Sequence, residues 1–142
     1  MKEITFATKK DYLAVINFLE KQTKYVEIVV SWDDTPNSPL LTNFGDSLVT
    51  IKDISHWLET GTKGTLYKYA LSLERKKAYF QQLRKFDSFF YNCEHPFSGM
   101  YVETTDFGYQ DIAFFNLQGE LLFYTITHEG LAWIKKSAEE NK

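Results

Sequence analysis

The sequence predicts one α+β domain, with a mixed or mostly antiparallel sheet of about five or six strands and helices mainly on one face. Three observations support this fold class. The 142 residues suffice for a single core. The chain opens with a strand–helix–strand pattern, and later contains a clear antiparallel hairpin. No repeat, linker or low-complexity segment divides residues 1–142.

The first third alternates between strand and helix patterns. Residues 3–7 are predicted to form a short strand. Thr8 and Asp11 have the spacing of a capping box, and the apolar stripe that follows predicts a helix ending near Gln22. Alternating apolar residues then predict a strand over 25–32.

The segment 33–46 is the least regular part of the chain. Its two prolines and one glycine exclude a long helix or a central strand, and loops of this length are often functional. A short strand is predicted over 48–51. Asp53 is then expected to cap a short helix that continues to Leu58.

The middle of the chain predicts a strand over 65–73 and a helix over 74–91. A helical interpretation of 65–73 also stays open. Apolar residues recur at helical spacing through the second segment, while its basic residues lie mostly off that stripe. A further short strand is expected over 100–104.

The clearest hairpin joins strands over 111–116 and 120–127, and Gly119 suits the left-handed position of the short turn. Because the first of these strands is apolar on both faces, it is expected to be central. A final helix is predicted to begin at Thr127, with Leu131 and Ile134 facing the core.

Charge is sorted along the chain. Residues 86–134 contain no Lys or Arg, seven acidic residues and thirteen of the 24 aromatic residues. Residues 63–85 instead carry seven basic residues and one acidic residue, within a net charge of −3. Such sorting predicts a surface of one sign that selects partners of the other sign.

Cellular location is predicted from what the sequence contains. One cysteine, Cys93, excludes an internal disulfide framework and is compatible with a reducing compartment. The first residues lack the apolar stretch of a signal peptide, and the apolar runs are far shorter than the roughly 20 residues that span a bilayer. A soluble, cytoplasmic protein without membrane contact is expected.

Catalysis has few candidates. Cys93 and His95 flank Glu94, but Cys–His catalysis usually draws its groups from distant segments, and zinc needs about four ligands. His56 and His128 could each act as a general base. The pair Asp33–Asp34 follows a strand, without a phosphate loop or a hydrolase motif. No catalytic residue, metal ligand or cofactor is assigned, and a non-enzymatic protein is the expectation.

Direct nucleic-acid binding is not expected. The basic residues of 75–85 lie on a helix whose other face is apolar, which is typical of an ordinary surface helix. The chain as a whole is acidic, whereas dedicated nucleic-acid binders are usually basic.

Mixed rings and carboxylates instead predict a protein interface, in which aromatic residues anchor the partner and acids steer it. The candidate partner-binding residues are Asp33, Asp34, Leu41, Phe44, Asp46, Tyr101, Glu103, Asp106, Phe107, Tyr109 and Asp111.

The hypothesis is a small cytoplasmic module that binds and inhibits a basic protein, such as a toxin or an enzyme acting on nucleic acid. Immunity proteins and antitoxins are similar in size and charge only, so no site is taken from them. Two alternatives stay open. One is a small hydrolase or metal-dependent enzyme, built from Asp33, Asp34, Cys93, His95 or His128. The other is a structural subunit of a larger complex.

Overall fold

The computed structural model describes residues 1–6, 8–30, 32, 38–58, 63–86, 89, 111–126 and 131–135. These residues form a mixed α+β structure in which the sheet has seven strands, more than the five or six expected from the sequence. The strands are β1 (Lys2–Ile4), β2 (Tyr25–Val30), β3 (Leu48–Ile54), β4 (Gly64–Ala70), β5 (Asp111–Phe115), β6 (Leu121–Ile126) and β7 (Leu131–Ile134). The helices are α1 (Lys9–Gln22), α2 (Pro39–Thr42) and α3 (Leu73–Leu83), with a 3₁₀ turn η1 (Gly45–Ser47).

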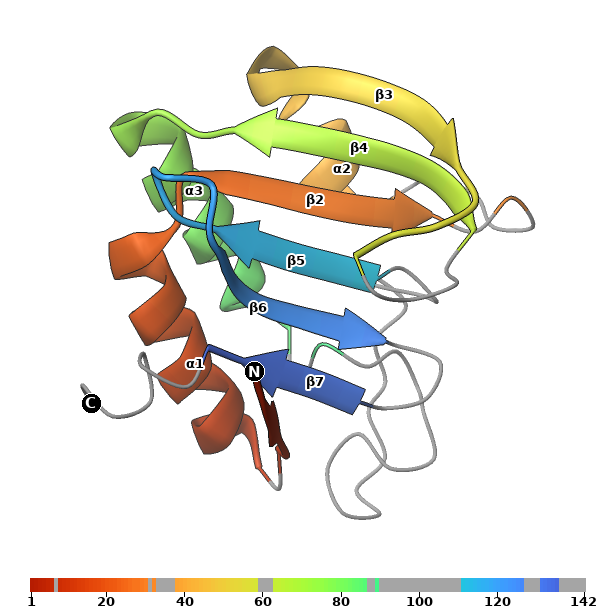
Figure 1. Ribbon diagram of the computed structural model, residues 1–142. Coiled ribbons are helices and arrows are strands. Elements are labelled where there is room, and N and C mark those ends of the chain that lie inside the picture. The colour runs from red at the N-terminus through yellow and green to blue at the C-terminus, as the bar shows by residue number, and fades with distance from the viewer. Residues whose placement is uncertain are drawn as a thin grey trace.

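The strand order is β1-β7-β6-β5-β2-β4-β3, and every pairing between neighbours is antiparallel (Figure 1). β5 pairs with both β2 and β6, so the prediction of a central strand is confirmed. β2 ends at Val30, two residues earlier than predicted, and Trp32 beyond it is 59% exposed.

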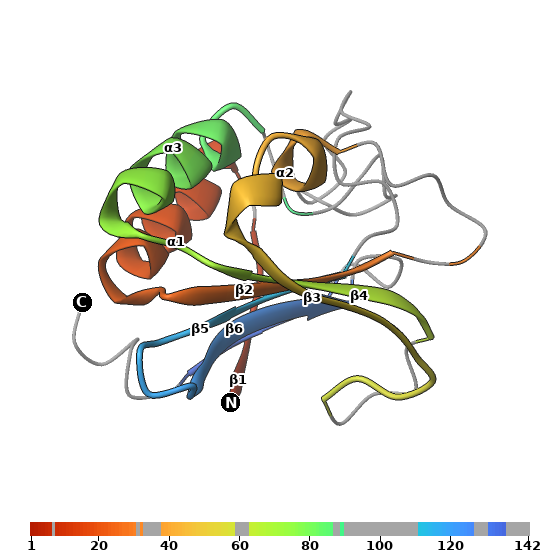
Figure 2. The same cartoon turned by 90° about the horizontal axis from the view of Figure 1, so that it is seen from above.

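Figure 2 shows the three helices on one side of the sheet. The predicted helix α1 is confirmed, including the reciprocal capping box between Thr8 and Asp11. Ser72 caps α3 by accepting a hydrogen bond from the backbone N–H of Arg75. The two helices are tied directly, because the hydroxyl of Tyr12 on α1 donates to the carbonyl of Leu83 on α3.

Aromatic rings fill the space between the helices and the sheet. Phe89 lies at the centre, with its ring 4.9 Å from the ring of Tyr12 and 4.9 Å from that of Phe123. Phe114 lies 5.9 Å from Phe80 on α3, which joins helix and sheet through ring contacts. Tilted and edge-to-face pairs of this kind contribute beyond the area that they bury.

The hairpin between β5 and β6 is confirmed, and Gly119 has the expected left-handed conformation, with φ of 81°. A register shift follows Phe114, so two consecutive residues of β6, Leu122 and Phe123, both pack in the helix-side core. This bulge lets β6 contribute more apolar volume to the core than strict alternation would allow.

The helix predicted over 53–58 is wrong. Asp53 lies within β3, which continues to Ile54, and its carboxylate accepts a hydrogen bond of 3.0 Å from the hydroxyl of Thr65 on β4. The Asp53 side chain, which was expected to cap a helix, therefore accepts a hydrogen bond across the strands instead. β-branched residues before it, including Ile51, also favour the strand.

The final helix predicted from Thr127 is wrong for residues 131–135, which are the part of it that the structure describes. Leu131–Ile134 form β7, which pairs with β6 on one side and β1 on the other. Ile134 does face the core, as expected, but it reaches the core by strand alternation. The predicted helix 74–91 ends at Leu83, and the predicted strand 100–104 lies outside the described residues.

Gly64 generates a test of the sheet packing. A Cβ atom there would lie 2.3 Å from the carbonyl oxygen of Val30, which is backbone and cannot move aside cheaply. We expect Gly64→Ala to lower the free energy of unfolding by about 2 to 4 kcal/mol, measured by urea denaturation.

The matched control is Gly45→Ala, because a Cβ at Gly45 meets nothing within 4 Å. Its free energy of unfolding should stay within about 1 kcal/mol of the wild type. Equal effects of the two substitutions would contradict the close approach of Gly64 to β2.

Tyr79 generates a prediction about alkaline pH. Burial, followed by the neighbouring Tyr69 and Tyr12 hydroxyls, raises the pKa of Tyr79 well above its ordinary value of about 10. The unfolded chain therefore ionises this group first, so the stability that it contributes is complete below about pH 10 and is lost as the pH rises further. The Tyr79→Phe variant should lose stability less steeply than the wild type above pH 10, in urea denaturation at a series of pH values. Identical slopes would contradict the prediction.

Candidate functional site

One face of the sheet has no helix on it in the described part of the chain (Figure 2). Side chains alternate along each strand, so β2 divides its residues between the two faces. Val26 and Ile28 pack in the helix-side core, whereas Val29 belongs to a separate small cluster with Leu66 and Ala113. We call the side of the sheet that carries this second cluster the open face.

Cross-strand register aligns a row of side chains on the open face. Opposite residues across the strands share a face, and their pairing brings together apolar and charged groups. In strand order from β7 to β4, the row is Trp133, Tyr124, Ala113, Glu27 and Lys68.

Trp57 covers the middle of this row. It is 4% exposed and packs with the Val29 cluster, where the small side chain of Ala113 leaves room for the indole. The indole N–H donates a hydrogen bond of 3.0 Å to the carboxylate of Glu27. Its ring meets that of Tyr124 edge-on, with centroids 6.4 Å apart. The segment that follows β3 thus fixes both a ring and a carboxylate on the open face.

Tyr124 and Trp133 form the exposed end of the aromatic row. Their rings are stacked, with centroids 4.9 Å apart and planes 16° apart. Both side chains are half-buried, so they keep solvent-exposed edges beside a fixed stack. Such rigid amphipathic rings are typical anchors of protein interfaces.

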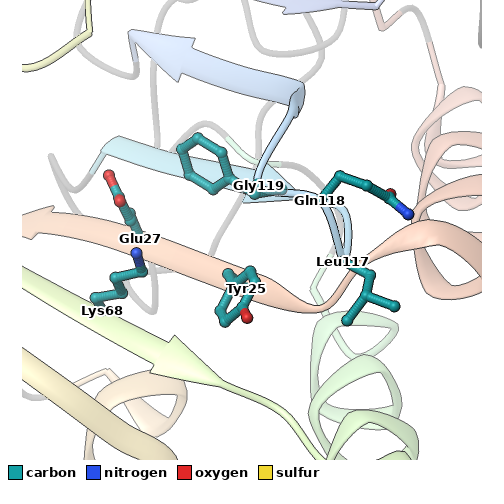
Figure 3. A pocket seen from close by; sticks show the side chains of 7 residues that line it. Tyr25, Glu27, Lys68, Leu117, Gln118 and Gly119 are labelled. Carbon is teal, nitrogen blue, oxygen red and sulfur yellow. The ribbon is translucent and has the colours of Figure 1, made fainter.

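A hollow of about 330 Å³ lies next to this row (Figure 3). Its walls include Tyr25 and Phe115, which are opposite each other in the β2–β5 register, and the turn at Gly119. Glu27 and Lys68 also line it, and the ammonium of Lys68 lies 5.2 Å from the centre of the Tyr25 ring. The hollow offers aromatic walls and one charge of each sign.

Four of the sequence-predicted interface residues can be placed. Leu41 and Phe44 are buried in the helix-side core, where the Phe44 ring contacts Tyr79 at 4.8 Å. Asp111 is also buried, at the start of β5. Asp46 is exposed and forms an ion pair of 3.3 Å with Arg75.

The burial of Leu41 and Phe44 corrects the expectation that these side chains are exposed among acids. Leu41 in the short helix α2, and Phe44 at the N-cap of η1, both face inward to the core. The other seven residues lie outside the described residues: Asp33, Asp34, Tyr101, Glu103, Asp106, Phe107 and Tyr109. The same holds for Cys93, His95 and His128.

Sheet topology determines where the undescribed connections attach. β2, β3 and β6 stop, and β4, β5 and β7 start, at the same end of the sheet (Figure 1). The register pairs that show this are Val29 with Asp111, Val30 with Thr65, Ile54 with Gly64, and Ile126 with Leu131.

The segments attached at this end are strongly acidic. Residues 31–37, 55–63, 90–110 and 127–130 contain seven carboxylates and a single basic residue, Lys63. The carboxylates are Asp33, Asp34, Glu59, Glu94, Glu103, Asp106 and Glu129. We call this the acidic end. The exposed Trp32, which lies beyond the end of β2, directly precedes Asp33 and Asp34 in the sequence.

The opposite end of the sheet carries several lysines, and we call it the basic end; Asp46, Glu74 and Glu120 also lie there. Lys24 enters β2 there and Lys135 leaves β7, while Lys76 of α3 donates to the carbonyl of Thr23. Glu120 lies in the turn at this end, where hydrogen bonds from Asn116 and Lys135 lower the pKa of its carboxyl.

Sequence reasoning missed the open face. Glu27 falls within the predicted strand 25–32 without any assigned role, and Trp57 falls within the predicted helix 53–58, which does not form. Trp133 belonged to the predicted final helix, which the structure replaces with β7. The available signal was the apolar character of both faces of β5 and β7, but it does not show which face the helices cover.

Comparisons with known proteins give no further guide: no family model, curated protein or solved structure matches the chain. Within the described residues, no group of three or more His, Cys, Asp or Glu side chains could hold a metal ion. In the same residues, no helix is long and apolar enough to cross a membrane.

The difference in burial between Trp57 and Trp133 can be tested. Trp57→Ala removes a buried ring and should lower the free energy of unfolding by about 3 to 5 kcal/mol. Trp133→Ala removes a half-buried ring and should cost about 1 to 2 kcal/mol. Urea denaturation of both variants measures the difference. A larger loss for Trp133→Ala would show that the outer ring, rather than Trp57, holds the open face together.

Proposed function

We propose that this protein is a binding module for a basic protein partner. The observation that supports it is the sheet topology, which attaches segments with seven carboxylates and one lysine to one end of the sheet. Carboxylates on connections that share one end of a sheet would produce a negative potential, which accelerates association with a positively charged surface. The proposed partner is a basic effector, such as a toxin or an enzyme that acts on nucleic acid.

Aromatic side chains provide anchors beside this charge. Trp32 is 59% exposed at the acidic end, and the stacked pair of Tyr124 and Trp133 lies on the adjoining open face. Exposed Trp and Tyr bury a large area at low entropic cost, which makes them frequent hot spots. Steering by acids and anchoring by rings are thus assigned to neighbouring parts of the molecule.

Inhibition follows from the chemistry of such a partner. Proteins that act on nucleic acid bind phosphates through basic clefts. A rigid surface rich in carboxylates can occupy such a cleft in place of the phosphates. We therefore propose that binding blocks the partner's activity, without a cofactor and in the cytoplasm.

The geometry favours binding over catalysis. The hollow on the open face is lined by Tyr25, Glu27, Lys68, Phe115 and the turn 117–119, a set without His, Cys or Ser. It resembles a recess for a partner side chain more than a set of groups for nucleophilic attack or for proton transfer.

The proposal is tested with charge-neutral variants and a purified partner. Candidate basic proteins encoded beside this gene are co-expressed, and those that copurify are measured by stopped-flow association. The variants Asp33→Asn/Asp34→Asn and Glu103→Gln/Asp106→Asn should each lower the association rate constant by about tenfold at low ionic strength. Added salt should slow the wild type and reduce the difference.

The matched control is Glu74→Gln/Glu120→Gln, which removes two exposed charges away from the acidic end. It should associate at the wild-type rate. Trp32→Ala should mainly raise the dissociation rate, because it removes an anchor and no charge. A partner that is acidic, or that associates equally fast with all three double variants, would overturn the proposal. A constitutive complex that never dissociates would instead indicate a structural subunit.

A further inference from the structure

A second hollow, of about 300 Å³, lies at the basic end of the molecule, away from the acidic end; it shares Leu117 with the hollow on the open face. It is formed where α1 ends, β2 begins, β4 ends and α3 begins. Its lining residues are Lys21, Gln22, Thr23, Lys24, Leu71, Leu73, Lys76 and Leu117. Three of the eight are lysines, and none is acidic.

Two of the lysines are held in place. The ammonium of Lys24 donates a hydrogen bond of 3.0 Å to the carbonyl of Leu71, and that of Lys76 donates one of 3.1 Å to the carbonyl of Thr23. Each bond links one chain segment of the hollow to another. An ammonium carries three N–H donors, so each keeps two for another acceptor. Preorganised donors lose little side-chain entropy when a ligand binds.

Thr23 supplies an independent observation. Its side chain is 3% exposed, and its Oγ1 has no hydrogen-bond partner within the described residues. A buried hydroxyl without a partner costs free energy, and such groups in native proteins call for an explanation. Thr23 also lines the hollow, so a small rearrangement that exposes this hydroxyl would let it donate to a bound anion.

We propose that this hollow binds a phosphate group. Lysines are common phosphate ligands, and a tetrahedral dianion has enough oxygens to accept from all three ammoniums and the Thr23 hydroxyl together. The carbonyl groups at the C-terminal end of α1 reduce the positive potential in the hollow. One of them, that of Thr23, already accepts a hydrogen bond from the ammonium of Lys76. The N-terminus of α3 begins at Leu73, on the rim of the same hollow, and its dipole favours an anion.

The rim also suggests what the phosphate is attached to. Leu73 is 85% exposed and Leu117 is 66% exposed, and both line the hollow. A phosphate ester with an apolar group would cover these side chains. Such an ester could be a small metabolite or a lipid headgroup, which share the chemistry proposed here.

The experiment titrates inorganic pyrophosphate into ¹⁵N-labelled protein and follows amide chemical shifts. The shifts should cluster at residues 21–24, 71–76 and 117. Lys76→Met should weaken binding by about tenfold or more, because it removes a charged donor. Lys77→Gln removes the same charge one residue along α3, outside the lining, and should change the dissociation constant by less than about threefold.

Thr23→Val separates a ligand role from a structural one. If the Thr23 hydroxyl has no role in binding, Thr23→Val should raise the stability and leave the affinity for pyrophosphate unchanged. That result would overturn the assignment of Thr23 to the site. We expect the gain in stability together with weaker binding. Absence of localised shifts, or equal losses for Lys76→Met and Lys77→Gln, would overturn the site as a whole.

Two further probes identify the source of the phosphate. Soluble short-chain phosphatidic acid should bind more tightly than pyrophosphate if the apolar rim takes part, and Leu73→Ser should remove that difference. Flotation with phosphatidylcholine vesicles, with and without phosphatidic acid, shows whether a membrane presents the ligand. None of the residues tested here lies at the acidic end. Failure to bind phosphate therefore leaves the proposal of a basic protein partner intact, and failure to find that partner leaves the phosphate site intact.

Discussion

The structure depends on aromatic packing between α1, α3 and a single face of the sheet. Phe89, Phe114 and Phe123 contact one another, and Tyr12 and Phe80 bring the two helices onto them. Each ring is fully buried, so removing one would leave a void that its neighbours cannot easily fill. Because the helices of the described chain pack on this side, the other face must be stabilised with much less apolar material.

That imbalance explains the character of the open face. Four buried residues, among them Trp57 and Ala113, form its compact centre, and partly buried rings surround them. Glu27 can lie close to this centre because the Trp57 indole donates to its carboxylate. Because the Trp57 indole already donates to it, the Glu27 carboxylate costs little free energy to hold in place. It also lies beside rings with exposed edges, where a bound protein could reach it. The requirement for stability and the opportunity for binding therefore coincide on this face.

The sequence was sufficient for elements whose signals are local. The capping box of α1, the turn at Gly119 and the alternation in β2 each depend on neighbouring residues, and the structure contains all three elements. It was insufficient where tertiary contacts decide. Asp53 could cap a helix or accept from Thr65, and only the β3–β4 pairing selects the second.

A four-residue segment such as Leu131–Ile134 fits the apolar period of a helix as well as that of a strand. Its pairing with β1 and β6 selects the strand. The candidate site shows the same limit: Phe44 lies among polar residues in the sequence but faces the core, where its ring contacts Tyr79 of α3. That the acidic connections attach at one end of the sheet follows only from the strand order, which no local pattern contains.

Strand length determines how far the two charged ends influence each other. β2, with six residues, spans about 20 Å at the usual rise per residue. The Debye length at physiological ionic strength is about 8 Å, so charges on the two ends are largely screened from each other in solvent. The proposed negative surface for a basic protein and the proposed hollow for phosphate could therefore act on one small molecule without cancelling each other. The seven-stranded antiparallel sheet separates the two proposed surfaces, because its connections alternate between its two ends.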